Sequence, residues 1–190
     1  MAKEIVLTEE EKKLTEHYKI FIGKSLARVK HRVKAKNLVK FAELMGNSNP
    51  KYVGVKKEDG TVDYTGVVAH PCYPTCFSVG DKGAAFDVTG WRFPPKEGEE
   101  QGPKVIRNFG KLLHAGQEYD YTRAEVPIQH GQKLTVTGVM EQLYIKSGMM
   151  WMVVRLFAHT QDEKLVVESV VTTVTRKGGW EQVFFKEGGK

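Results

Sequence analysis

The apolar positions follow a helical period in the first half of the chain. Between residues 33 and 45 they recur at helical spacing and form one stripe, made of Val33, Leu38, Val39, Phe41, Ala42 and Met45. Such a stripe predicts an amphipathic helix, the main helix of the protein. A shorter helix is predicted after Thr8 and to about Tyr18, because Thr8 and Glu11 have the spacing of a capping box.

The last third of the chain follows the period of β-strands. Segments rich in Val, Thr, Tyr and Phe cover residues 117–123, 133–145, 149–160 and 164–175. Turn residues such as Lys146-Ser147-Gly148 separate them, which predicts antiparallel strands joined by hairpins. Residues 149–154 are apolar on both faces, so this strand should be central or lie at an interface. A long helix followed by such strands predicts an α+β fold, with an antiparallel sheet wrapped around a central helix.

The length and composition suit one domain over residues 1–190, since 41% of the residues are apolar. Residues 93–104 are polar and interrupted by proline and glycine, which predicts a mobile surface loop. No apolar run is long enough to span a bilayer, and residues 1–4 lack the apolar centre of a signal peptide. We therefore expect a cytoplasmic protein.

The two cysteines, Cys72 and Cys76, follow His70 in a His-x-Cys-x-x-x-Cys string. This spacing departs from the usual Cys-x-x-Cys metal clamp, and no second ligand cluster completes a tetrahedron. We expect packed, reduced thiols, no metal site and no cofactor.

The net charge of +6 includes one local concentration of basic residues, formed by Arg28, Lys30, His31, Arg32, Lys34, Lys36 and Lys40. It has two interpretations: the solvated start of a charged helix, or a surface that attracts an anionic ligand such as the phosphates of coenzyme A. On the second interpretation Arg32 and Lys36 are candidate substrate-binding residues. Nucleic acid is not expected, because no aromatic residues are interleaved and no known binding motif is present.

Four strings in order resemble a known family. They are residues 41–50 (FAELMGNSNP), 66–75 (GVVAHPCYPT), 112–121 (LLHAGQEYDY) and 131–138 (GQKLTVTG). Over residues 35–175 the chain resembles the N-terminal half of MaoC-like (R)-specific hydratases and dehydratases, the FAS1-like dehydratase domain. The resemblance implies a hot dog fold, an acyl thioester of CoA or of acyl carrier protein as ligand, and a second hot dog subunit as partner.

The first string holds the family's catalytic positions with different residues. The family pattern there is Gly-Asp-x-Asn-Pro-x-His, whose aspartate and histidine act as an acid/base pair, whereas this chain has Asn47 and Tyr52. An amide takes no proton at neutral pH, and a phenol with a pKa near 10 is a poor base. The resemblance therefore implies a subunit without the pair, inactive alone, in a hydratase or dehydratase complex whose partner supplies the aspartate and histidine.

Three further residues are candidates for contact with the acyl ligand: Asn49, His70 and Tyr73. Each also has a structural interpretation, as a turn residue, a hydrogen-bonded histidine and a core aromatic respectively. Two other functions stay open. One is a hot dog acyl-CoA thioesterase, with Glu43 as the carboxylate on the helix, and the other is an acyl-CoA-binding module without enzymatic activity.

Overall fold

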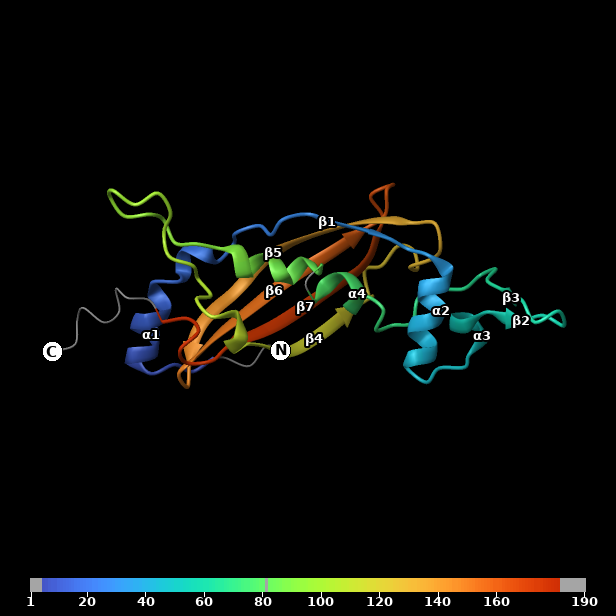
Figure 1. The fold of residues 1–190 in the computed structure, drawn as a ribbon, viewed down its shortest axis with the longest axis horizontal. Helices are drawn as coiled ribbons and strands as arrows, with labels where there is room; N and C mark the ends of the chain where they lie inside the picture. The colour runs from blue at the N-terminus through green and yellow to red at the C-terminus, as the bar shows by residue number, and fades with distance from the viewer. Residues whose placement is uncertain (1–4, 81, 182–190) are drawn as a thin grey trace.

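The computed structural model describes residues 5–80 and 82–181, and its main element is a five-stranded antiparallel sheet (Figure 1). The strand order is β1-β5-β6-β7-β4. The strands are β1 (Val29–Arg32), β4 (Leu112–Asp120), β5 (Lys133–Lys146), β6 (Met149–His159) and β7 (Leu165–Thr175). Short helices connect and cover this curled sheet, so the α+β class predicted from the sequence is confirmed.

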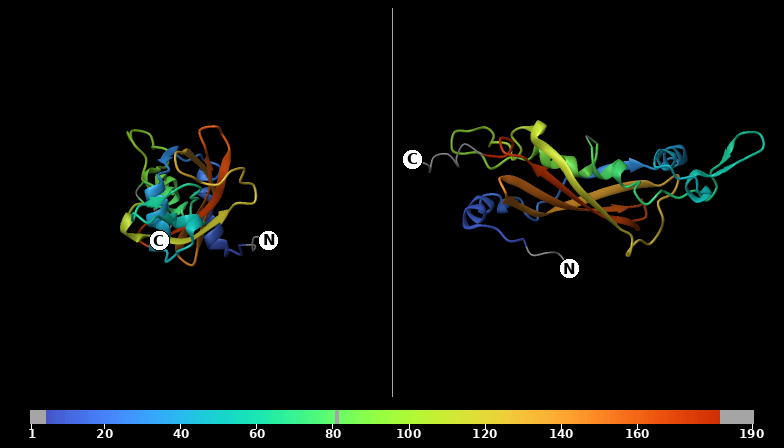
Figure 2. Two further views of the ribbon diagram at one scale, coloured as in Figure 1. Left: turned by 90° about the vertical axis from the view of Figure 1, so that its right-hand side faces the viewer. Right: turned by 90° about the horizontal axis from the view of Figure 1, so that it is seen from below.

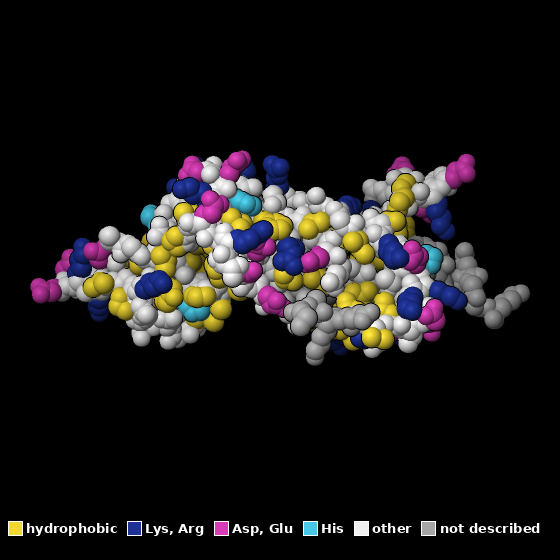
Figure 3. Space-filling model, turned by 180° about the vertical axis from the view of Figure 1, so that it is seen from behind, with side chains coloured by type: hydrophobic (Ala, Val, Ile, Leu, Met, Phe, Trp, Pro, Cys, Tyr) yellow, Lys and Arg dark blue, Asp and Glu magenta, His cyan; other side chains and the backbone are white. Residues whose placement is uncertain are grey.

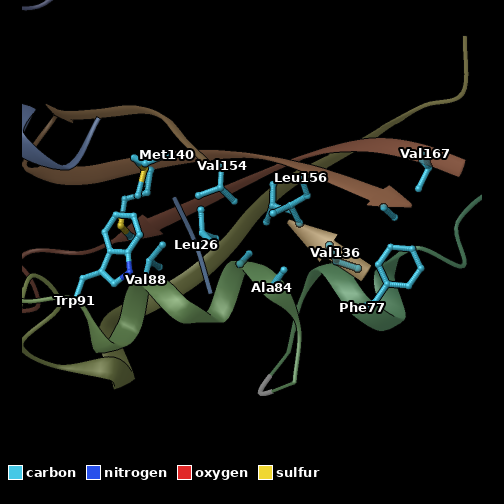
Figure 4. Packing of buried hydrophobic residues seen from close by; sticks show 14 of the residues in the cluster. Leu26, Phe77, Ala84, Val88, Trp91, Val136, Met140, Val154, Leu156 and Val167 are labelled. Carbon is cyan, nitrogen blue, oxygen red and sulfur yellow. The ribbon is translucent and has the colours of Figure 1, made fainter. Parts of the chain in front are cut away.

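Two short helices lie against the inner face of the sheet. They are α4 (Thr75–Ser78) and the 3-10 helix η2 (Ala84–Gly90). Figure 4 shows Phe77, Ala84 and Val88 on these helices, on the side that meets the sheet residues Val136, Met140, Val154 and Leu156. The curled sheet therefore encloses a short, broken helical segment.

The main helix predicted from the apolar stripe is real but lies elsewhere. It is α2 (Ala35–Leu44), which packs mainly on α3 (Pro50–Val53) beyond one end of the sheet, beside the small hairpin of β2 (Val55–Lys56) and β3 (Val62–Asp63) (Figures 1 and 2). The prediction that the sheet wraps around this helix was wrong. The enclosed segment contains Gly80, Gly83 and two prolines shortly before it, so it carries no long helical period in the sequence.

The first helix, α1 (Glu9–Glu16), has the predicted capping box. The Thr8 hydroxyl accepts from the Glu11 amide, and the Glu11 carboxylate accepts from the Thr8 amide. The helix is joined to the sheet by the Thr15 hydroxyl, which accepts from the Ile145 amide at 2.9 Å. A 3-10 turn, η1 (Lys19–Phe21), follows, and the Tyr18 hydroxyl before it donates to the Trp180 carbonyl at 2.7 Å.

Three of the four predicted strands have nearly the predicted bounds, and the fourth, β4, begins earlier than expected. The strand β6 lies between β5 and β7, as its apolar residues on both faces predicted. The free edges of the sheet are therefore β1 and β4. The strand β1 was not predicted, because its residues Val29–Arg32 are mostly basic and were expected at the start of a helix.

The loop between β-bridged residues Arg92 and Lys104 projects from the body of the fold (Figure 1). Its base is fixed, since the Phe93 side chain is buried and the Phe93 amide donates to the Pro103 carbonyl at 2.9 Å. The mobility predicted for residues 93–104 stays a prediction.

A third 3-10 helix, η3 (Phe109–Lys111), leads into β4. In the core between the sheet and η2, Leu156 fits against a glycine of the neighbouring strand. A Cβ on Gly138 would lie 2.4 Å from the Leu156 Cδ2 atom, so only glycine leaves room for this leucine.

Replacing Leu156 by alanine should lower the free energy of unfolding by about 2 to 5 kcal/mol, because the side chain is 1% exposed and its removal leaves a cavity. Urea unfolding followed by circular dichroism measures the change. The matched control is Leu44→Ala in α2, where the side chain is 76% exposed and little should change. Equal losses for the two variants would contradict the position of the core.

Candidate functional site

The loop after α2 is held together by its own amide side chains. The Asn47 side-chain oxygen accepts from the Asn49 amide at 2.9 Å, and the Asn49 side-chain oxygen accepts from the Lys51 amide at 3.0 Å. Asn49 thereby caps α3, directly before Pro50 at the first helical position. These contacts agree with the interpretation of Asn49 as a turn residue. Contact of Asn47 or Asn49 with a ligand stays a prediction.

Tyr52 on α3 lies against His70, which comes from a separate segment. The two ring centroids are 5.5 Å apart, and the Phe41 ring of α2 lies 6.0 Å from the same histidine. The His70 Nδ1 atom accepts from the Cys72 amide at 3.2 Å, so a neutral His70 ring carries its proton on Nε2. Tyr52, at the family's histidine position, is thus packed beside a histidine of this chain.

A pocket of about 190 Å³ opens beside these rings. Its lining residues are Lys51, Tyr52, Val68, Ala69, Pro71, Tyr121, Pro127 and Ile128. The Tyr121 hydroxyl, just after β4, donates to the Pro71 carbonyl at 2.6 Å and closes one wall. Ligand pockets usually measure about 300 to 1,000 Å³, so this hollow alone holds only part of an acyl-thioester ligand.

A series of hydrogen-bonded polar side chains joins the start of α4 to β4, and none of its members was predicted as a site residue. The Thr75 hydroxyl is 3.3 Å from the Gln117 side-chain oxygen and also contacts the Tyr119 hydroxyl. Gln117 and Tyr119 are two residues apart on a strand and therefore share one face. The spacing of Gln117 and Tyr119 is visible in the sequence, but nothing local to them indicates that Thr75, which is distant along the chain, lies beside them.

The tyrosine hydroxyls near this hydrogen-bonded series stay protonated. Burial raises the pKa of Tyr119 to about 12. Burial also raises the pKa of Tyr121, with further electrostatic contributions from Tyr119, Cys72 and Tyr52. Those contributions place Tyr52, Cys72, Tyr119 and Tyr121 in one neighbourhood, and the raised pKa values keep Tyr119 and Tyr121 protonated at neutral pH.

Tyr73 lies in the core, 1% exposed. Its hydroxyl is 3.0 Å from the His31 Nε2 atom of β1, and its ring meets that of Phe41 at 5.5 Å. Burial raises the pKa of Tyr73 to about 12 and lowers the pKa of His31. A neutral His31 can accept a hydrogen bond from the Tyr73 hydroxyl, so this pair links β1 to the segment before α4.

The basic run divides between two elements. Arg32 on β1 lines a second hollow of about 360 Å³ with Lys30, His31, Lys133, Leu134, Thr135 and Gln161. Lys36 is exposed on α2 and does not line it. Neither Lys30, Arg32 nor Lys133 forms an ion pair with a carboxylate of the described residues. On the face seen in Figure 3, by contrast, basic and acidic side chains alternate.

Cys72 and Cys76 are free thiols near this site; Cys72 is half-buried and Cys76 is exposed, so the expectation of packed thiols was wrong for Cys76. Across residues 5–80 and 82–181, no group of three His, Cys, Asp or Glu side chains is arranged to hold a metal ion. Over the same residues, no helix has the length and apolar content to cross a membrane.

A family model described as the FAS1-like, dehydratase domain region matches residues 20–169. A UPF0336 protein of Streptomyces avermitilis is 26% identical over 157 residues, which covers 82% of this chain and 93% of the relative. A second UPF0336 protein, of Streptomyces griseus, is 24% identical and covers 77% of this chain and 85% of its own length.

Solved structures are also similar in fold. The crystal structure of the C-terminally truncated HadBC (3R-hydroxyacyl-ACP dehydratase) complex from Mycobacterium tuberculosis matches with a TM-score of 0.57 and 16% identity, over 81% of this chain and 96% of that one. A MaoC-like dehydratase from Phytophthora capsici matches with a TM-score of 0.55 and 22% identity, over 84% of this chain and 48% of that one. The hot dog fold predicted from the resemblance is confirmed.

The free energy of unfolding should decrease as the pH falls, because His31 titrates. Burial lowers the pKa of the folded ring below the ordinary 6.5 of the unfolded chain. As the pH falls through this value, the unfolded chain therefore binds more protons than the folded chain does. The stabilisation from the neutral ring is therefore present above pH 6.5 and lost below it. His31→Gln, which keeps an acceptor for Tyr73, should flatten this decrease between about pH 7.5 and about pH 5.

Urea unfolding at a series of pH values measures the effect. The control is His114→Gln, which replaces an exposed histidine of β4 and should keep the slope of the parent protein. An unchanged slope in His31→Gln would contradict the assignment of the pH dependence to this residue.

Proposed function

The chain belongs to the family of the FAS1-like dehydratase domain region, and from this membership we propose that it is an acyl-thioester-binding subunit of an enoyl-CoA hydratase or 3-hydroxyacyl dehydratase complex. It is the half without the acid/base pair. The observation that carries the proposal is the motif segment of residues 46–52, which is folded beside a pocket but has Asn47 and Tyr52 at the two catalytic positions.

Hydration of a conjugated thioester has three requirements. A base activates water, an acid protonates the α-carbon, and hydrogen-bond donors hold the thioester oxygen as negative charge develops. Asn47 has no proton-accepting group at neutral pH, and its side-chain oxygen already accepts from the Asn49 amide. The phenols of Tyr119 and Tyr121 have raised pKa values. Their hydroxyl protons are already donated, to Thr75 and to the Pro71 carbonyl, so the third requirement needs another donor, and the first two fall to a partner.

Two features of the fold support a second hot dog subunit as that partner. The strand β4 is nine residues long and lies at a free edge, where another strand can pair with it. Leu113 and, just before the strand, Phe109 expose 40% and 56% of their surface beside this edge. The strand β6, for which the sequence allowed a central or an interface position, is central, so the edge that can take a partner strand is β4.

The thioesterase alternative receives less support. It needs a carboxylate on the helix that the sheet encloses, whereas Glu43 is exposed on α2, beyond the end of the sheet. A binding module without enzymatic activity would use the same pocket. The assay below separates these functions from the proposed one.

The complex of this chain with a hot dog protein encoded beside its gene should hydrate trans-2-enoyl-CoA, and this chain alone should not. In the complex, Asn47→Ala and Tyr52→Phe should each reduce kcat by about tenfold or less, because neither removes a proton-transfer group. Absorbance of the conjugated thioester measures hydration. Release of free CoA, measured in parallel, reports a thioesterase.

The matched comparison is replacement of the partner's motif aspartate by asparagine, which should reduce kcat by about a hundredfold to ten-thousandfold. A thousandfold loss from Asn47→Ala or Tyr52→Phe would instead mean that this chain runs the chemistry. Binding of acyl-CoA without turnover by any pair would leave the binding module as the function.

The hollow on β1 should attract the phosphates of the thioester carrier, as proposed for Arg32, with Lys36 as a more distant contributor. Arg32→Glu should weaken binding of acyl-CoA by roughly fivefold or more and reduce its dependence on salt, since exposed charges are screened within about 10 Å at moderate ionic strength. Isothermal titration at several salt concentrations measures both quantities.

Lys177→Glu is the control, because it makes the same charge change after β7, at the opposite end of the sheet from β1. If Arg32→Glu and Lys177→Glu bind acyl-CoA equally well, the basic run is only a solvated surface.

A further inference from the structure

Gln117 has a side chain whose two ends are treated differently by the fold. Its oxygen is bound by the Thr75 hydroxyl at 3.3 Å. Its Nε2 atom is buried and has no hydrogen-bond partner in the structure. A buried amide donor without a partner loses its hydration and gains nothing in return, so an arrangement that keeps it needs an explanation.

The hydrogen bonds around Gln117 have a fixed direction. Thr75 has a single hydroxyl proton, and because it donates this proton to the Gln117 oxygen, the Tyr119 hydroxyl must donate to Thr75. The direction runs from Tyr119 through Thr75 to Gln117. Both ends of this series are on β4, and the middle is the first residue of α4.

This direction determines what the site offers. In the orientation that the structure records, the Gln117 oxygen is occupied by the Thr75 hydroxyl. The two Nε2 protons are consequently the free donors of the series. The other buried polar atoms without a partner in the described chain, Ser78 Oγ, Trp151 Nε1 and Thr175 Oγ1, are not held in a comparable series.

The donor lies at the side of the fold where a ligand and a partner would meet. Gln117 and Tyr119 are on the free-edge strand β4, with α4 beside it (Figure 1). Tyr119 is close enough to Tyr121 to affect its pKa, and Tyr121 lines the pocket beside the motif segment. Gln117 does not itself line this pocket, but Tyr119 and Tyr121 connect it to the pocket along the same strand end.

We propose that Gln117 donates a hydrogen bond from Nε2 to the carbonyl oxygen of the acyl thioester, and that Thr75 and Tyr119 are positioning residues that hold its amide in that orientation. This inference rests on the proposed function and names the contact that this chain would contribute to it. Gln117 forms no covalent bond. During hydration the water oxygen bonds to the β-carbon as the double bond between the α- and β-carbons becomes a single bond. The partner's acid/base pair takes one water proton and delivers a proton to the α-carbon, the other water proton stays in the new hydroxyl, and the thioester oxygen carries the transient negative charge that the amide stabilises.

Binding of non-reacting ligands tests this contact without reference to turnover. The probes are decanoyl-CoA and its thioether analogue S-decyl-CoA, which lacks the carbonyl oxygen. For the complex of the full-length chain with its partner, isothermal titration should give about tenfold tighter binding of the thioester than of the thioether. This factor is the contribution of one hydrogen bond in a site from which water is excluded. Gln117→Glu and Gln117→Leu should lose this preference and bind the thioether as the parent does.

The positioning residues have their own readout. Thr75→Val removes the hydroxyl at constant shape and should reduce the thioester preference, whereas Thr75→Ser should restore it. Gln142→Leu, which replaces a half-buried glutamine of β5, a strand that β6 and β7 separate from β4, is the matched control and should keep the full preference. Thermal unfolding of each variant confirms that a lost preference does not come from a lost fold.

The two proposals fail in different ways. If the parent complex binds both probes and the Gln117 variants keep its thioester preference, the inference about Gln117 is overturned and the proposed function stands. If the parent complex hydrates no enoyl-CoA and binds neither probe, the proposed function is overturned and the contact with it. In the hydrating complex, Gln117→Leu should lower kcat by about a hundredfold, as loss of a donor to a developing oxyanion does.

Discussion

Burial of α4, η2 and Trp91 under the curled sheet is the interaction on which the rest of the arrangement depends. Phe77, Ala84, Val88 and Trp91 have little exposed surface, and the long strands β5 and β6 close over them. Burying each large apolar side chain contributes about 1.5 to 3 kcal/mol. Once this segment is fixed, the residues just before it have little freedom. Tyr73 is brought to β1 and Thr75 to β4, so that the buried segment sets the positions of polar groups at both edges of the sheet.

Those two contacts explain why the site consists of donors. Tyrosine and threonine hydroxyls at the start of α4 are partly enclosed by the same apolar surroundings that hold the segment in place. Burial disfavours the ionised forms, which raises the pKa values of Tyr73 and Tyr119 and lowers that of His31. A neutral network of this kind can orient a ligand oxygen but cannot take a proton from water at neutral pH. The altered motif, with Asn47 and Tyr52, has the same chemical character.

The sequence was sufficient to predict the features that depend on neighbours along the chain. The capping box at Thr8 and the strands β5 to β7 follow from local spacing and alternation, and both were predicted correctly. The identity of the enclosed helical segment was not, because α2 has the better amphipathic stripe although it lies beyond the sheet. The strand β1 was missed for a related reason. Its ladder with β5 is a long-range interaction that overrides the weak preference of a basic tetrapeptide.

The same distinction applies to the site. The Asn47 and Asn49 contacts join residues only two positions apart, so the turn interpretation could be derived from the sequence. The Thr75 to Gln117 contact joins residues 42 positions apart, and the unpaired Nε2 atom appears only when both are placed. A family motif identifies a segment by the residues that carry a reaction. When those residues are replaced, the polar groups that the fold leaves without a hydrogen-bond partner indicate where a ligand can bind. In this chain that group is the Gln117 Nε2 donor on β4, at the free edge of the sheet.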